Sequence, residues 1–243
     1  MLTKSRLAYR ICTPLDVIPG GFTFNSYLVA DDEPLLFYTG YRKLFPVTLE
    51  AIRNVLPVEK LRWIGGSHFE GDEYGALNDF LAAAPEATPF GAEIGVLTSL
   101  NDFAARPAHG FRDGEEFSIG SRRMKWLYTP HVPHGWDCGI LFDLSTETLL
   151  CGDLFTQPGA KMEAVTEWEV LTASEGMRGM MDYYAHATST SAILRLAELR
   201  PSMLACQHGS AYRGDGAALI RELATTIESG NAKLSEQPRV VTA

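Results

Sequence analysis

The sequence predicts a single α/β domain, residues 1–243, in which sheets and helices form layers. Three observations support this fold class. The chain of 243 residues is 46% hydrophobic, which suits one well-filled core. Stretches with strand and helix patterns alternate along it without a clear break. No internal repeat, low-complexity tract or linker divides it.

The first half of the chain alternates between the two patterns. Residues 22–39 contain two β-rich runs around the polar turn "DDEP", which predicts a hairpin. Residues 43–56 carry apolar side chains at helical spacing. A short strand, "LRWIGG" at 61–66, precedes two further expected helices, at 74–85 and 94–105.

The second half begins with β-rich runs and ends with helices. Strands are expected within three runs, at 115–120, 122–130 and 139–153, the last with a turn near Ser145–Thr148. Residues 154–170 have mixed character and predict a long loop. The remaining expectations are a helix at 174–199, a strand at 202–207, a helix at 216–234 and a flexible tail at 234–243.

Composition and charge exclude several classes of function. The net charge is −9 and the pI is about 5.2, which argues against a nucleic-acid partner because phosphate binding requires clustered Lys and Arg. The sequence has no signal peptide and no apolar run long enough to span a membrane, so a cytoplasmic protein is expected. Its four cysteines are widely spread, which is typical of reduced thiols.

The stretch "GGSHFEGDEYG", residues 65–75, concentrates side chains that can bind a metal. In an extended loop, residues at i, i+2 and i+4 face the same side, so His68, Glu70 and Asp72 are expected to point together. The flanking glycines allow the backbone to turn without strain. Taken alone, the pattern is weak, because acidic loops with one histidine are usually solvent-exposed.

Three further candidate ligands follow β-like runs elsewhere in the chain. His134 follows "MKWLYTPHVP", Asp153 follows "ETLLCG" and His208 follows "MLACQ". In layered α/β folds, the loops after strands gather at one rim of the sheet, where functional groups collect. Together with His68, these residues predict a metal site at that rim. Cys151 and Cys206 lie two residues before two of these candidates and are expected to be packing residues.

These motifs resemble those of the metallo-β-lactamase superfamily, and in particular its flavodiiron branch. The shared features are H-x-E-x-D after a strand, a histidine after "TP", an aspartate in "CGDLF" and a late "QHG". The resemblance implies a four-layer αββα sandwich. It also implies a ligand set: His68, Glu70, Asp72, His134, Asp153 and His208. His131 is the alternative to His134, which is preferred because Asp137 follows it at the flavodiiron spacing.

The type of ligand indicates the metal. Histidines and carboxylates without thiolates suit iron or manganese better than a structural zinc site. The resemblance therefore implies two iron ions that bind O₂ or NO. Glu70 favours this oxygen chemistry, since zinc hydrolases of the superfamily typically have histidine in its place.

Two features depart from the flavodiiron pattern. Glu73 stands where flavodiiron proteins usually have histidine, so it either ligates a metal, leaves a position open, or faces solvent. The flavodoxin domain of those proteins has no counterpart here, and no flavin phosphate loop is recognisable. A module without flavin resembles stand-alone oxygen-binding diiron proteins and would need a separate redox or signalling protein as partner.

Three functions are therefore weighed. The first is a diiron protein that binds O₂, as an oxygen sensor or as a partner-dependent oxidoreductase of O₂ or NO. The second is a binuclear metal hydrolase of an ester, thioester or phosphodiester, with Asp72 as proton acceptor. The third is a signalling module whose metal only stabilises the fold. Because relatives of this kind often form dimers, a homodimer is one expected state.

Overall fold

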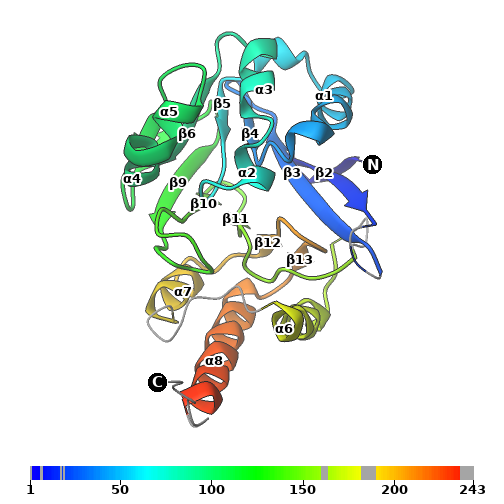
Figure 1. The fold of residues 1–243 in the computed structure, drawn as a ribbon, viewed down its shortest axis with the longest axis vertical. Coiled ribbons are helices and arrows are strands. Elements are labelled where there is room, and N and C mark those ends of the chain that lie inside the picture. The colour runs from blue at the N-terminus through cyan, green and yellow to red at the C-terminus, as the bar shows by residue number, and fades with distance from the viewer. Residues whose placement is uncertain are drawn as a thin grey trace, which may run out of the picture.

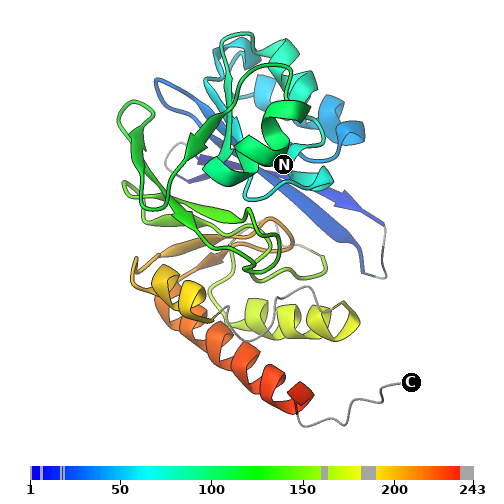
Figure 2. The same cartoon turned by 60° about the vertical axis from the view of Figure 1, so that its left-hand side comes forward.

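Two mixed β-sheets pack face to face, and helices cover the outer face of each (Figures 1 and 2). The computed structural model describes residues 2–5, 8–16, 18, 20–159, 164–181 and 190–235. These four layers confirm the αββα sandwich that the motifs imply.

The first sheet has seven strands that follow one another in sequence order: β1 (Leu2–Ser5), β2 (Ala8–Leu15), β3 (Phe22–Val29), β4 (Leu35–Phe37), β5 (Trp63–Gly65), β6 (Thr88–Ala92) and β7 (His109–Phe111). Strands β1 to β4 are antiparallel, whereas β4 to β7 are parallel. The pairing of β3 with β4 confirms the hairpin predicted at 22–39.

The second sheet has six strands in the order β13 (Tyr212–Arg213), β12 (Met203–Ala205), β11 (Thr148–Leu150), β10 (Gly139–Asp143), β9 (Arg123–Tyr128) and β8 (Glu116–Ser118). Strand β10 is antiparallel to both of its neighbours, and β11 is parallel to β12. Strands β9, β11 and β12 therefore run in one direction, and their carboxyl ends lie at one edge.

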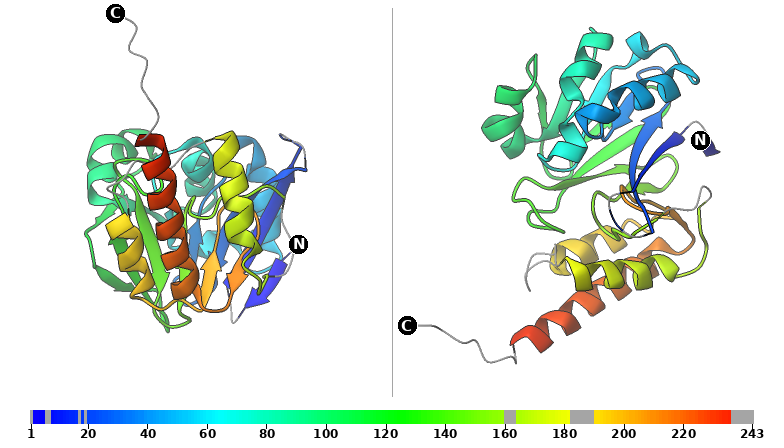
Figure 3. Two further views of the ribbon diagram at one scale, coloured as in Figure 1. Left: turned by 90° about the horizontal axis from the view of Figure 1, so that it is seen from below. Right: turned by 45° about the vertical axis from the view of Figure 1, so that its right-hand side comes forward.

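The outer face of the first sheet carries short helical elements: η1 (Arg42–Leu44), α1 (Phe45–Arg53), η2 (Val58–Lys60), α2 (Gly71–Tyr74), α3 (Leu77–Ala83), α4 (Glu93–Gly95), the π-helical turn η3 (Val96–Leu100) and α5 (Asn101–Phe103). The second sheet is covered by α6 (Glu169–Met180), α7 (Thr190–Ala197) and α8 (Gly216–Ser235). Figure 3 shows α8 lying between α6 and α7.

Successive side chains along a strand point to opposite faces of the sheet, and in this fold they fill three apolar layers. In β4, Leu36 faces the helices of the first sheet, while Leu35 and Phe37 face the second sheet. In β10, Leu141 lies between the sheets, and Phe142 packs under α6 to α8. A strand with a hydrophobic layer on each side is buried on both faces, which is why these strands are apolar throughout.

Several sequence expectations differ from the structure. The helix expected at 74–85 is shorter in the structure: Tyr74 is the last residue of α2, the chain turns at Gly75–Ala76, and α3 covers Leu77–Ala83. The helix expected at 174–199 corresponds to α6 and α7, and residues 182–189 lie outside the described residues. Helix α8 continues to Ser235, and the remainder of the expected tail, 236–243, also lies outside them.

Two further expectations concern the reduced state of the cysteines and the absence of a membrane-spanning segment. All four cysteines are free, and Cys151 and Cys206 are fully buried in the layer under α8, which confirms their expected packing role. Among the described residues, no helix is both long and apolar enough to cross a membrane.

Candidate metal centre

Four loops that follow strands meet at one edge of the sandwich. His68 follows β5 of the first sheet, and His134 lies in the loop between β9 and β10. Asp153 follows β11, and His208 follows β12. A hydrogen bond of 2.8 Å from the Gly139 amide to the Ser67 carbonyl joins the two sheets beside this edge. The strand ends therefore come together as the sequence predicts.

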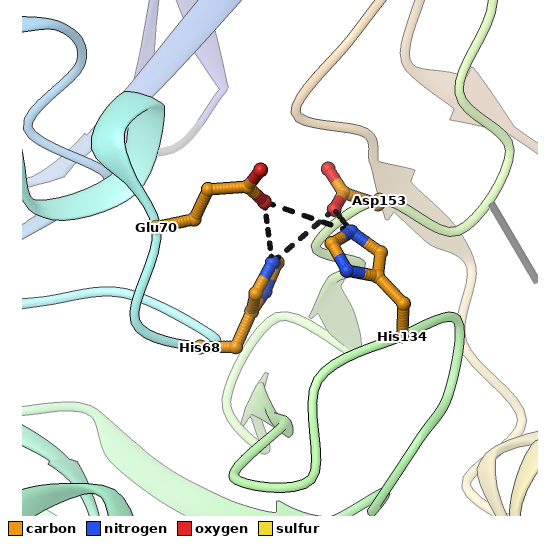
Figure 4. Close-up of side chains that lie close together, drawn as sticks. All are labelled: His68, Glu70, His134 and Asp153. Carbon is orange, nitrogen blue, oxygen red and sulfur yellow. Dashed lines mark hydrogen bonds and ion pairs between the residues drawn. The ribbon is translucent and has the colours of Figure 1, made fainter. Parts of the chain in front are cut away.

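Four of the candidate side chains form one cluster, which Figure 4 shows in close-up. His68 Nε2 lies 2.8 Å from Glu70 Oε2, and His134 Nε2 lies 2.8 Å from Asp153 Oδ2. The cross distances, His68 to Asp153 and His134 to Glu70, are both 3.6 Å. One ligand atom from each residue lies within 4.8 Å of the others, so all four can reach a single cation.

A second group of ligand atoms lies on the other side of Asp153. His208 Nε2 is 3.2 Å from Asp72 Oδ2 and 3.2 Å from Asp153 Oδ1. Asp153 thus presents Oδ2 to the first cluster and Oδ1 to this second one. A carboxylate that faces two sites with its two oxygens has the geometry of a bridging ligand.

Asp72 reaches the second cluster and not the first, because the extended backbone conformation ends before this residue. Glu70 is extended, with φ −141° and ψ 161°, but α2 begins at Gly71 and contains Asp72. The expectation that His68, Glu70 and Asp72 would point together is therefore wrong for Asp72. The change from strand-like to helical backbone sends its carboxylate to His208.

Glu73 is fully buried, so the reading in which it faces solvent is wrong. Its carboxylate accepts hydrogen bonds from the backbone amides of Ser67 and His68 and from the Ser67 hydroxyl. Its Oε1 lies 3.2 Å from His68 Nδ1. Glu73 is thus on the opposite side of the His68 ring from the first cluster, which gathers at Nε2.

The other histidines lie apart from the two clusters or outside the described residues. His131 is exposed and adopts a left-handed backbone with φ 61°, whereas His134, three residues later, faces Asp153. His109 is exposed, with Glu115 at 3.7 Å. His186 falls within 182–189, outside the described residues.

Partners on the far side of the His208 ring orient this imidazole, and a further hydrogen bond fixes the loop after His68. His208 Nδ1 donates to the Thr23 carbonyl at 2.9 Å, and Phe22 stacks on the ring with centroids 4.6 Å apart. Asp137 accepts a hydrogen bond of 2.9 Å from the Phe69 amide and so fixes the loop between His68 and Glu70. The sequence did not indicate Thr23 or Phe22, because they belong to β3 of the other sheet and only the fold brings them close.

In the two clusters, the pKa of the shared carboxylate is lowered and the pKa values of the histidines beside it are raised. Burial alone would lower the pKa of His208, but hydrogen bonds to Asp153 and Asp72 outweigh it and raise the pKa to about 10. Burial would raise the pKa of Asp153, yet its hydrogen bonds with His134 and His208 hold that pKa well below its usual range. The hydrogen bond to Asp153 likewise raises the pKa of His134. Ionised carboxylates thus hold protons on the imidazoles, and a cation can replace those protons.

The donor set fits a pair of first-row metal ions. One buried oxygen, Asp72 Oδ1, has no hydrogen-bond partner among the described residues, although a buried carboxylate oxygen normally needs one. A cation in the second cluster would satisfy it. All donors are imidazole nitrogens or carboxylate oxygens, which suit iron or manganese.

A layered αββα sandwich with a His/carboxylate cluster at its strand-end edge is the architecture of metallo-β-lactamase-like proteins. The chain belongs to the ODP family beta lactamase group, whose family model matches residues 22–209. The resemblance to the flavodiiron branch of the superfamily is confirmed by the relatives of the chain.

Among curated proteins, the chain is similar to the rubredoxin-oxygen oxidoreductase of Megalodesulfovibrio gigas, with 26% identity over 206 residues that cover 81% of this chain and 50% of the relative. It is also similar to the anaerobic nitric oxide reductase flavorubredoxin homolog of Escherichia coli O157:H7, with 26% identity over 141 residues that cover 56% of this chain and 34% of the relative. The chain thus spans half or less of the length of these relatives.

Solved structures show the same fold. The rubredoxin oxygen:oxidoreductase from Desulfovibrio gigas superposes with a TM-score of 0.79 at 21% identity, covering 94% of this chain and 62% of that one. A fragment, residues 1–254, of the putative diflavin flavoprotein A 5 from Nostoc sp. PCC 7120 gives a TM-score of 0.78 at 18% identity and covers 94% of both chains.

Proposed function

We propose that this protein binds O₂ at a pair of iron ions held by the two clusters, as an oxygen sensor or as a partner-dependent oxidoreductase of O₂ or NO. The observation that carries the proposal is the two-sided placement of Asp153, with one oxygen toward each cluster. The names of the similar proteins, an oxygen oxidoreductase and a nitric oxide reductase homolog, support the choice of diatomic ligand.

The clusters divide the proposed ligands unequally. His68, Glu70 and His134 would hold one iron, and Asp72 and His208 would hold the other. Asp153 would be shared between them. When bound, a pair of iron ions supplies redox electrons and open positions for a diatomic ligand.

The surrounding residues hold the second cluster in place and shield it. Phe22 stacks on His208, and Phe24 meets the same ring edge-on with centroids 5.2 Å apart. Tyr41, which is 43% exposed, packs on Phe24 at 4.8 Å and lies at the outer side of this wall. An apolar wall of this kind limits the access of water but not of a small apolar gas.

The partners follow from the two forms of the proposal. An oxidoreductase would receive electrons from a separate redox protein, because imidazole and carboxylate ligands bind the metal ions but cannot supply electrons to them. A sensor would pass its signal to a protein partner. A homodimer is compatible with both forms, and neither form assigns a role to nucleic acid or membrane.

The experiment that tests the proposed function is metal analysis of the native protein, followed by optical spectra of the anaerobically reduced protein before and after exposure to O₂. Two irons per chain and a spectral change on O₂ exposure are expected. Protein loaded with zinc serves as the control and should show no change. Stoichiometric zinc in the native protein, with turnover of an ester and no response to O₂, would overturn the proposal in favour of a hydrolase.

A further inference from the structure

We propose that Glu73 is a positioning residue, which holds His68 so that Nε2 of its ring faces the first cluster. This inference rests on the proposed function only in that the first cluster binds a metal ion. It assigns to Glu73 a role other than that of a metal ligand, although Glu73 directly follows Asp72 in the motif.

The contacts of Glu73 define this role. Its carboxylate receives the backbone amides of Ser67 and His68, the latter at 3.0 Å, together with the Ser67 hydroxyl. His68 Nδ1 lies 3.2 Å from Oε1 and 3.1 Å from the Ser67 hydroxyl, so the ring is the fourth donor and is shared between Glu73 and Ser67. The carboxylate is fully buried, and four donors are enough to offset the loss of its hydration.

Hydrogen bonds to its carbonyl fix the backbone of Glu73 as well. Its carbonyl accepts hydrogen bonds from the amide of Thr39 at 2.7 Å and from the Thr39 hydroxyl at 2.8 Å. The residue therefore links the end of β4 to the loop after β5. Because both ends are fixed, the carboxylate has little freedom to turn toward either cluster.

The local sequence leaves room for this carboxylate. A Cβ at Gly66 would lie 2.7 Å from Glu73 Oε2 and 2.9 Å from the ring of Tyr74, so a side chain at Gly66 would displace one of them. The second glycine of "GGSHFEGDEYG" is thus explained by the approach of Glu73 to the backbone of Ser67 and His68.

Four donors surround the Glu73 carboxylate, so it acts as a hydrogen-bond acceptor and favours one tautomer of the His68 imidazole. A carboxylate can only accept hydrogen bonds, so it favours the proton on Nδ1 and leaves the Nε2 lone pair free for a metal. An amide in its place could present its NH₂ group to Nδ1 and would then favour the proton on Nε2. Glu73→Gln should therefore weaken metal binding through His68 without a large change of shape.

The role of Glu73 makes the two clusters unequal. With Glu73 turned to His68, the first cluster has four protein ligands, and the second has Asp72, His208 and Asp153 among the described residues. The effect of Glu73→Gln should consequently be confined to the first cluster. This separation distinguishes a positioning residue from a ligand of the second cluster.

The test is titration of metal-free protein with Co²⁺, followed by visible absorption, in two backgrounds that each keep one cluster. His208→Ala leaves the first cluster intact, and His68→Ala leaves the second. Adding Glu73→Gln should weaken Co²⁺ binding roughly 10- to 100-fold in the first background. It should change the affinity less than about twofold in the second, by the same principle that outer partners act through the ligand they contact.

Two controls keep the result interpretable. Glu59→Gln, an exposed change of the same chemistry at η2, should have no effect in either background. If Glu73→Gln fails to give a cooperative thermal unfolding transition, Ser67→Ala replaces it. This change removes a hydroxyl that contacts both the Glu73 carboxylate and His68 Nδ1, and it should weaken the first cluster in the same direction by a smaller factor.

Two outcomes would overturn the inference. Unchanged Co²⁺ affinity at the first cluster would show that Glu73 does not act through His68. A weakened second cluster would show that Glu73 is a ligand there. Neither outcome depends on O₂. A wild-type protein that binds two Co²⁺ ions, but whose reduced iron form gives no response to O₂, would therefore contradict the proposed function and leave the role of Glu73 intact.

Discussion

Asp153 meets His208 through Oδ1, at 3.2 Å, while its other oxygen, Oδ2, lies 2.8 Å from His134. The two contacts use opposite oxygens of one buried carboxylate. A residue in this position belongs to both clusters, and its replacement should weaken metal binding in both.

Asp153→Asn should reduce bound iron from two ions per chain to less than one, because an amide nitrogen cannot replace either carboxylate oxygen as an anionic ligand. Metal analysis of the purified variant measures this. Asp102→Asn, an exposed change in α5, is the matched control and should keep two irons. Retention of two irons by Asp153→Asn would contradict the bridging role.

Gly152→Ala should lower the free energy of unfolding by about 1–3 kcal/mol, since a Cβ there would lie 2.8 Å from Ser67 Oγ and φ is +56°. Urea denaturation of the metal-free protein is the measurement. Gly176→Ala is the matched control: Gly176 lies within α6 with no atom within 4 Å of its Cβ position, so this change should stabilise the protein by about 0.5–1 kcal/mol. Equal effects of the two changes would contradict the argument.

Arg122→Met should destabilise the protein by about 3–5 kcal/mol, because it leaves the buried Asp143 without its cationic partner. The two side chains are 5% and 2% exposed and lie 2.6 Å apart. Replacing both, as Arg122→Met with Asp143→Leu, should cost clearly less than the sum of the single changes. Additive effects in this double-mutant cycle, measured by thermal unfolding, would mean that the pair is not coupled.

Asp31 should make the stability of the fold depend on pH in the acid range. Burial would raise its pKa, but hydrogen bonds from the backbone amides of Asp32, Ser121 and Arg122 and from the Ser121 hydroxyl together outweigh it and lower the pKa. A lowered folded pKa means that the stabilisation is complete above the unfolded value of about 3.9 and is lost as the pH falls through the folded pKa.

Asp31→Asn removes this dependence. Relative to the wild type, the variant should be less stable near neutral pH, by about 0.5–1 kcal/mol for a partly exposed group of this kind, and the difference in stability should narrow below pH 4. Denaturation curves at pH 7 and pH 3.5 measure the effect. A difference that is the same at both values would contradict the assignment.

Much of the candidate site could be predicted from the sequence because its ligands follow strands that are themselves easy to recognise. The runs before His68, Asp153 and His208 are apolar and short, and they end where the polar motif begins. Such strands are buried on both faces, so their pattern is plain. Each ligand could then be placed at a sheet edge before its partners in space were known.

Other features could not be predicted, for identifiable reasons. Strand β6, "TPFGA", contains both a proline and a glycine, which weaken the strand pattern although the segment is paired on both sides. The environment of Glu73 depends on a turn of α2 that brings it back to Ser67, six residues earlier. A backbone change within a motif is invisible to spacing alone, which also explains the wrong expectation for Asp72.

The placement of the two clusters at the edge shared by both sheets has a consequence for the chain as a whole. His68 belongs to the first sheet, whereas His134, Asp153 and His208 belong to loops of the second. A metal pair held by both clusters therefore ties together segments that are far apart in sequence. Because the unfolded chain does not form this site, the free energy of metal binding adds to the free energy of folding. Occupancy of the centre would thus stabilise the fold across both sheets, in a chain whose four cysteines are free.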